Sequence, residues 1–254
     1  MEINITFLPR EKPNIPIEAE NIIPSRFLNR DEIIVWEGNK KRLLSDIAEI
    51  QYTGSANTVE EIHLILKGEI SRVKRIGEYM DGGHITVNGD IGMHCGNFME
   101  SGLIEIVGNA DAWLGREMRG GTIICSGSCS DYCGSGYRGE KRGMRGGTIE
   151  VMGDAGDFCG EYNSGGQIII HGSCKDMAGV EMNDGKLTIY GDCMRPCGNL
   201  TGGNVIVHGT VLEMLPGFRN DGPVMIDGVS YTRFTGDVAN RGKGELIVRE
   251  YVRK

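Results

Sequence analysis

The chain has 254 residues and a formal net charge of −8, with 24% charged and 39% hydrophobic residues. This acidic balance argues against general nucleic-acid binding, which needs a dominant basic face. No apolar run approaches the roughly 20 residues of a membrane span, and the first residues lack the basic and apolar segments of a signal peptide. We therefore expect a cytoplasmic protein without membrane contact, whose eight cysteines are reduced rather than paired.

The first 59 residues are predicted to form a small α+β cap. Residues 3–8 (INITFL) alternate like a strand, and residues 16–27 predict a loop with a short helix. Residues 31–44 predict a hairpin that turns at 38–40, and residues 45–52 fit a short helix or a strand. A cap is expected because a stack of strands exposes an edge and apolar side chains at its end.

A repeat follows the cap. A glycine comes after each short apolar run, at steps of 21, 19, 19, 26, 19, 19, 18 and 19 residues. These marker glycines are Gly68, Gly89, Gly108, Gly127, Gly153, Gly172, Gly191, Gly209 and Gly228. The unit is therefore about 19 residues, the step of 26 contains seven inserted residues, and a last apolar run stands at 246–248.

Two positions in each unit are always apolar. Four residues before the marker glycine stand Leu64, Ile85, Ile104, Ile123, Ile149, Ile168, Leu187, Val205 and Val224. Two residues before it stand Leu66, Val87, Ile106, Cys125, Val151, Ile170, Ile189, Val207 and Ile226. Such alternation predicts a half-buried strand, and its recurrence predicts a mainly β solenoid over residues 60–254, with the last residues closing its end. Glycine pairs such as Gly146–Gly147 precede strands, not helices, which argues against a phosphate-binding loop.

The cysteines are predicted to be packing residues. Cys129 and Cys133, like Cys193 and Cys197, have a spacing that metal ligands also use. Yet the same coil positions carry alanine, leucine, isoleucine or valine in other units, as a small apolar core position does. Five methionines recur once per unit and predict a packed stripe: Met80, Met99, Met118, Met144 and Met182.

The histidines predict no catalytic site. His84, His171 and His208 are expected at different coil positions with local hydrogen bonds. His94 stands beside Cys95, and no carboxylate stands at a spacing from it that would indicate a catalytic pair. We expect no catalytic, cofactor-binding or metal-ligating residue on this chain.

The seven inserted residues create a basic segment. Arg138, Lys141, Arg142 and Arg145 stand against one carboxylate, Glu140, so the local charge is four minus one, or +3. The segment is expected to bulge outward, because the apolar positions resume at Ile149. It is either a solvated loop or a docking loop for an acidic surface, since guanidinium groups match carboxylates well.

The repeat resembles a known family. Residues 82–99 (GGHITVNGDIGMHCGNFM) resemble the GXGXG repeat, which forms a right-handed β-helix in the carboxyl-terminal domain of the glutamate synthase large subunit. The same repeat forms the body of the C subunit of formylmethanofuran dehydrogenase, and it covers residues 60–228 of this chain. Residues 7–27, 32–47 and 72–121 are similar to that subunit in particular.

The resemblance implies a non-catalytic structural subunit of an oxidoreductase complex. In that family a tungsto- or molybdopterin subunit reduces CO2, an amidohydrolase-like subunit with a dinuclear metal centre condenses formate with methanofuran, and ferredoxin-like subunits carry iron–sulfur clusters. It also implies a second ligand for the basic segment, the glutamate-rich tail of methanofuran. Two alternatives stay open: a stand-alone glutamate synthase repeat subunit, and the C subunit of a formyltransferase/hydrolase complex.

Overall fold

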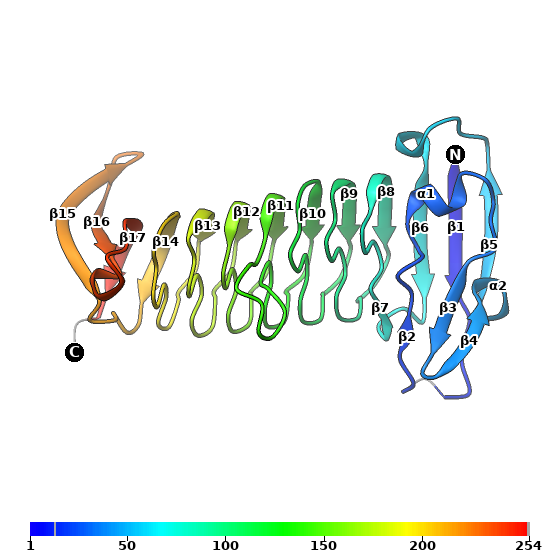
Figure 1. The fold of residues 1–254 in the computed structure, drawn as a ribbon, viewed down its shortest axis with the longest axis horizontal. Coiled ribbons are helices and arrows are strands. Elements are labelled where there is room, and N and C mark those ends of the chain that lie inside the picture. Colours follow the sequence, from blue (N-terminus) through cyan, green and yellow to red (C-terminus); the bar gives the residue numbers. More distant parts are fainter. Residues whose placement is uncertain (13, 253–254) are drawn as a thin grey trace.

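The protein is mainly β, as predicted. A computed structural model describes residues 1–12 and 14–252; Pro13 of the predicted cap and residues 253–254 of the predicted closing segment lie outside it. The strands form one 13-stranded sheet and one four-stranded sheet, and the molecule is elongated along the long sheet (Figure 1). No helix among the described residues is long and apolar enough to cross a membrane.

The repeat builds a parallel ladder of strands. The strands, in spatial order, are β6 (His63–Gly68), β8 (Asp81–Val87), β9 (Ser101–Ile106), β10 (Thr122–Cys125), β11 (Arg145–Val151), β12 (Ser164–Ile170), β13 (Asp184–Ile189), β14 (Asn204–Val211) and β17 (Gly244–Tyr251). The predicted apolar positions pair directly, for example Ile149 with Ile168 and Val151 with Ile170. A second parallel ladder of single bridges joins the residues two after each marker glycine, as between Cys129 and Ala155.

The core consists of the predicted positions stacked on one another. The paired strand residues from Leu64 to Val207 are fully buried, and so are the five methionines. All eight cysteines are buried and free, so their predicted packing role is confirmed. Glycine is required where the chain turns into each strand: Gly147 has a φ of +83°, and a Cβ on Gly146 would lie 2.3 Å from the Arg119 carbonyl oxygen.

The end of the repeat differs from the prediction. The run at 224–226 belongs to β15 (Phe218–Ile226), which pairs antiparallel with β16 (Val229–Gly236), and Val224 and Ile226 are only partly buried. Asp227 and Gly228 both have positive φ and join these strands as a two-residue hairpin turn, so Gly228 is not a marker glycine. The place beside β14 is taken instead by β17, whose Leu246 and Val248 are fully buried.

The amino-terminal segment joins both sheets. The predicted strand is β1 (Glu2–Phe7), which extends the long sheet beside β6, and β5 (Ala48–Thr53) forms that sheet's edge. The predicted hairpin is β3 (Ile34–Glu37) and β4 (Lys40–Leu43), which share the small sheet with β2 (Ile17–Glu18) and β7 (Val73–Lys74). The remaining elements are the short helices α1 (Pro24–Phe27), α2 (Leu44–Ile47), η1 (Val59–Glu61) and η2 (Val238–Asn240).

Candidate functional site

The basic segment divides into a loop and a strand residue. Arg138, Lys141 and Arg142 are exposed in the loop between β10 and β11 and make no ion pair in the described structure. Arg145 instead begins β11, and its Nη2 atom lies 3.9 Å from Oε2 of Glu117. The four cations adjoin in the sequence, but in the described structure only Arg145 is ion-paired, and the other three are not.

Arg145 ends a chain of six alternating charges along the turns of the coils. The members of this ion-pair chain, in order, are Glu18, Arg75, Glu78, Arg116, Glu117 and Arg145. These six residues carry three negative and three positive charges, and Lys74 adds a fourth cation at 3.7 Å from Glu18. The ion-pair chain connects Glu18 of the amino-terminal segment to Arg145, the first residue of β11. The sequence analysis did not predict this ion-pair chain.

Arg116 is the central member of this chain. Its guanidinium lies 3.9 Å from Glu78 and 4.0 Å from Glu117, and both carboxylates and Arg116 itself are buried. Burial lowers the pKa of Arg116, while the two carboxylates act in the opposite direction. Its Nε atom is buried without a hydrogen-bond partner, so the group depends on charge pairing and on ring contacts.

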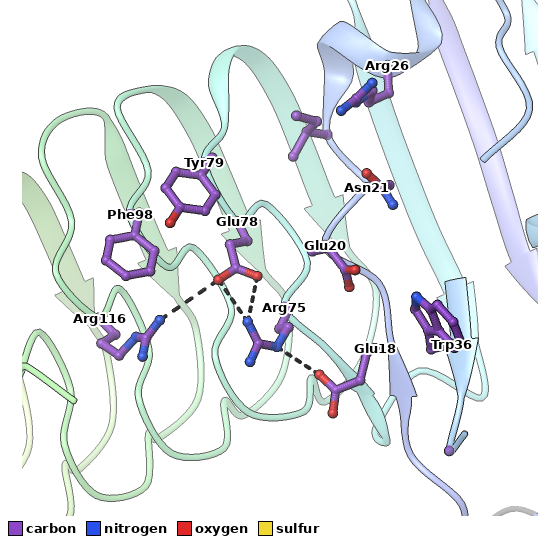
Figure 2. Close-up of a pocket in the computed structure, with 12 residues that line it drawn as sticks. Glu18, Glu20, Asn21, Arg26, Trp36, Arg75, Glu78, Tyr79, Phe98 and Arg116 are labelled. Carbon is purple, nitrogen blue, oxygen red and sulfur yellow. Dashed lines mark hydrogen bonds and ion pairs between the residues drawn. The ribbon is translucent and has the colours of Figure 1, made fainter. Parts of the chain in front are cut away.

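A cleft opens beside the amino-terminal half of the ion-pair chain (Figure 2). Its volume is about 670 Å³, and its walls come from β2, α1 and β3 on one side and from three successive coil turns on the other. Trp36 and Tyr79 are exposed there, at 40% and 51%. Arg75 donates from Nε to Glu18 and from Nη1 to Glu78, at 2.9 and 3.0 Å. Tryptophan, tyrosine and arginine are the side chains that most often dominate binding at protein interfaces.

Aromatic side chains line the same turns, and the sequence analysis did not predict their stacking. Four rings stack from coil to coil at centroid distances of 5.1, 5.0 and 5.1 Å: His94, Trp113, Tyr132 and Phe158. All four residues have positive φ, a conformation that side chains other than glycine adopt at some cost. The sequence did contain a signal for this stack, because each of the four residues stands five residues after a marker glycine.

The histidines differ from the prediction in one respect. His171 and His208 occupy the same coil position, one before the marker glycine, and stack on either side of Tyr190 at 5.1 and 4.6 Å. Local hydrogen bonds are present as expected, from His171 to Glu150 at 2.8 Å and from His84 to Glu105 at 2.7 Å. Burial, followed by the charge of Arg116, lowers the pKa of His94 to about 4.

Burial changes the acidity of the cysteine thiols. Burial raises the pKa of Cys95 and Cys193 to about 12, which keeps these thiols protonated at neutral pH. In the part of the chain that the structure describes, no three His, Cys, Asp or Glu side chains are arranged to hold a metal ion. The cleft, by contrast, presents ion-paired guanidinium groups and rings, which are suited to binding a partner surface.

The chain is similar in sequence to several known proteins. The chain is 33% identical over 95 residues to the C subunit of molybdenum-containing formylmethanofuran dehydrogenase 1 of Methanosarcina barkeri, covering 35% of this chain and 31% of that protein. It is 39% identical over 97 residues to the C subunit of tungsten-containing formylmethanofuran dehydrogenase 2 of Methanothermobacter wolfeii, covering 36% of each. The chain resembles the C subunit of formylmethanofuran dehydrogenase. The resemblance predicted from the sequence is thereby confirmed.

The similarity to the C subunit is local, and the similarity of fold is global. A third relative, the C subunit of the molybdenum-containing enzyme of Methanothermobacter marburgensis, is 41% identical over 100 residues, which cover 37% of this chain and 24% of that protein. The chain thus matches a quarter to about a third of these relatives' length, and no protein-family model matches it. A crystal structure of the formyltransferase/hydrolase complex from Methylorubrum extorquens with methylofuran contains a chain of the same fold. Its TM-score is 0.84 at 24% identity, covering 96% of this chain and 98% of that one.

Proposed function

We propose that this chain is a non-catalytic structural subunit of formylmethanofuran dehydrogenase, which supports CO2 reduction and condensation with methanofuran. The observation that carries the proposal is the local identity of 33–41% to the C subunits of both the molybdenum and the tungsten enzymes. On this proposal residues 60–254 form a right-handed β-helix and residues 1–59 its cap. The in-register parallel strands and the second ladder of bridges support that architecture.

The redox and hydrolytic centres are proposed to lie on partner subunits. The relatives are named as molybdenum- and tungsten-containing enzymes, whereas the cysteines of this chain are buried in its own core. The pterin, the iron–sulfur clusters and the dinuclear metal centre would then belong to pterin-binding, ferredoxin-like and amidohydrolase-like subunits. We also propose a cytoplasmic location without nucleic-acid or membrane partners, in keeping with the net charge of −8.

Two surfaces are proposed to contact these partners. The cleft offers Trp36, Tyr79 and Arg75 to a partner subunit. Arg138, Lys141 and Arg142 offer three unpaired cations to an acidic partner surface or to the glutamate-rich tail of methanofuran. Arg145 is assigned to the ion-pair chain instead, because Glu117 already holds it.

A second candidate function is that of the C subunit in a formyltransferase/hydrolase complex, which contains no pterin metal. The similarity of fold over nearly the whole of both chains favours it. The two candidates differ in their partners and therefore in their metal content.

Purification of the complex from its native cell through a tag on this chain tests both candidates. Co-purified subunits are identified by mass spectrometry, and molybdenum, tungsten and iron are measured. A pterin subunit with stoichiometric molybdenum or tungsten supports the first candidate, and a formyltransferase without either metal supports the second. Neither set of partners would contradict both, and CO2 reduction or formyl transfer by the isolated chain would contradict a non-catalytic role.

A further inference from the structure

Two histidines lie side by side on the outer face of the long sheet. His63 of β6 and His84 of β8 pair in register, and their rings are stacked at a centroid distance of 3.9 Å with an angle of 1° between the ring planes. Each stands next to a buried residue of its strand, Leu64 or Ile85, so both side chains point away from the core. Both residues are partly exposed, and an ion in solvent can therefore reach the two imidazoles.

Carboxylates stand on both sides of this histidine pair. Glu2 of β1 is the register partner of His63 and is exposed. Glu105 of β9 lies on the other side, and its Oε2 atom is 2.7 Å from Nε2 of His84. The adjacent strands β1, β6, β8 and β9 thus place two imidazoles and two carboxylates on one face of the sheet (Figure 1).

The Nε2 atoms of the two histidines approach the same point. Nε2 of His63 lies 2.8 Å from Oγ1 of Thr86, and Nε2 of His84 lies 3.3 Å from the same oxygen. As the parallel rings stand, they are not oriented to share a metal ion with a third His, Cys, Asp or Glu, and this holds for every such group in residues 1–12 and 14–252. A rotation about χ2 tilts the rings toward one another, and this torsion is broad in histidine.

We propose that His63, His84 and Glu105 form a binding site for one Zn²⁺ ion on the outer face of the sheet. Imidazole nitrogen and carboxylate oxygen are common Zn²⁺ ligands, and a site with three protein ligands keeps its fourth position for water. Mg²⁺ and Ca²⁺ take oxygen ligands, so the two imidazoles favour Zn²⁺ over these ions. The bound ion joins three neighbouring strands and lies beside the negative charge of Glu2.

A matched pair on a later coil lacks the second imidazole. Nε2 of His171 lies 2.8 Å from Oε1 of Glu150, as His84 lies beside Glu105, but the stacked neighbour of His171 is Tyr190. One imidazole and one carboxylate are fewer ligands than Zn²⁺ requires. All eight cysteines are buried, so the folded chain presents no thiolate on its surface to compete for the ion.

Isothermal titration of Zn²⁺ into the untagged, chelator-treated chain at neutral pH tests the site. We expect one ion per chain, and no binding of Mg²⁺ at the same concentration. His63→Ala and His84→Ala should each weaken Zn²⁺ binding at least about ten-fold, the smallest loss that removal of an outer partner of a metal ligand typically causes. Glu105→Gln should also weaken it, whereas His171→Ala should bind Zn²⁺ as the unmodified chain does.

Thermal unfolding without metal checks that each variant is folded. Where an alanine variant is not, His63→Gln or His84→Gln takes its place, because it keeps a polar side chain and removes the imidazole. The site is overturned if the unmodified chain binds no Zn²⁺, if the His63 and His84 variants bind it unchanged, or if His171→Ala weakens binding as much as they do. Binding of Mg²⁺ as tight as that of Zn²⁺ also overturns it, because the carboxylates alone would then hold the ion.

Discussion

Glu78 and Arg116 are 38 residues apart in the chain, yet Oε1 of Glu78 lies 3.9 Å from Nη2 of Arg116, and both residues are buried. The separation is two repeats, so the arginine reaches across the coil that carries Asn97. Asn97 is fully buried, and its amide atoms have no hydrogen-bond partner. The charge pairing therefore spans a coil turn that holds a fully buried polar side chain.

Removing the central charge is expected to destabilise the fold. Arg116→Met leaves Glu78 and Glu117 buried without their shared cation, and loss of one partner from a buried pair costs about 3–5 kcal/mol. We expect the lower part of this range, because Arg75 and Arg145 still contact the two carboxylates. Arg119→Met is the control, because Arg119 pairs with Glu100 on the exposed surface, where a pair contributes about 0–1 kcal/mol. Urea unfolding of both variants measures the difference. Equal loss of stability would show that the buried pairs add nothing beyond a surface pair.

The same substitution should be costly on the inner face of a strand and tolerated on the outer face. Ile170→Asp places an unpaired carboxylate between Val151 and Ile189 in the core and is expected to cost several kcal/mol and most of the soluble protein. Ile169→Asp changes the neighbouring residue, which is partly exposed on the outer face of the sheet. Soluble yield and thermal unfolding report the outcome. A stable Ile170→Asp variant would mean that the inner and outer positions are exchanged.

His94 is expected to make stability depend on pH. Burial, and then the charges of Arg116, Arg75 and Lys74, lower its folded pKa to about 4. Between that value and the ordinary pKa of about 6.5 the unfolded chain binds a proton that the folded chain does not, so stability falls as pH falls. After allowance for solvent screening, the loss by pH 4 is about 1–2 kcal/mol.

The control for this effect is His94→Phe, which keeps a ring against Trp113 and removes the titrating group. Urea unfolding of both proteins between pH 7 and pH 4 isolates the contribution of His94 from that of other titrating groups. As the pH falls, the unmodified protein should lose stability relative to the His94→Phe variant. A difference that stays constant over this range would contradict a depressed pKa.

Charge reversal tests the role of the inserted loop. If the proposed docking role is correct, the triple variant Arg138→Glu, Lys141→Glu, Arg142→Glu weakens assembly or raises the apparent KM of the proposed complex for methanofuran. Each exposed pair contributes only about 0.2–1 kcal/mol, so the three act together and the effect shrinks at high salt. Arg145 stays unchanged, because its reversal would place a second carboxylate beside Glu117.

A matched control for the loop exists on the small sheet. Lys40 and Lys41 are exposed on β4 and make no ion pair among the described residues, whereas Arg42 is paired with Glu37 at 3.2 Å and stays unchanged. Reversal of the two lysines should leave assembly and KM closer to the unmodified values at low ionic strength. If this double variant and the triple loop variant behave alike, the loop is a solvated bulge with no particular partner.

The sequence alone was sufficient for the repeat, its buried positions and the packing of the cysteines. These follow from local periodicity, because every coil places the same residue, such as Ile149 or Ile168, at the same point of a narrow core. The hairpin at Gly38–Asn39 and the strand at residues 2–7 were likewise predictable, since turn chemistry and alternation act over a few residues.

Tertiary structure alone decided the partners of the charges and of the last strands. The apolar run at 224–226 matches the repeat, but the turn at Asp227–Gly228 folds it back on β16, and β17 takes its place beside β14. Arg145 belongs to the basic run in the sequence, yet Glu117 of an adjoining coil binds it. Such contacts depend on which turns the stack brings together, two coils apart for Glu78 and Arg116, and a local pattern carries no information about them.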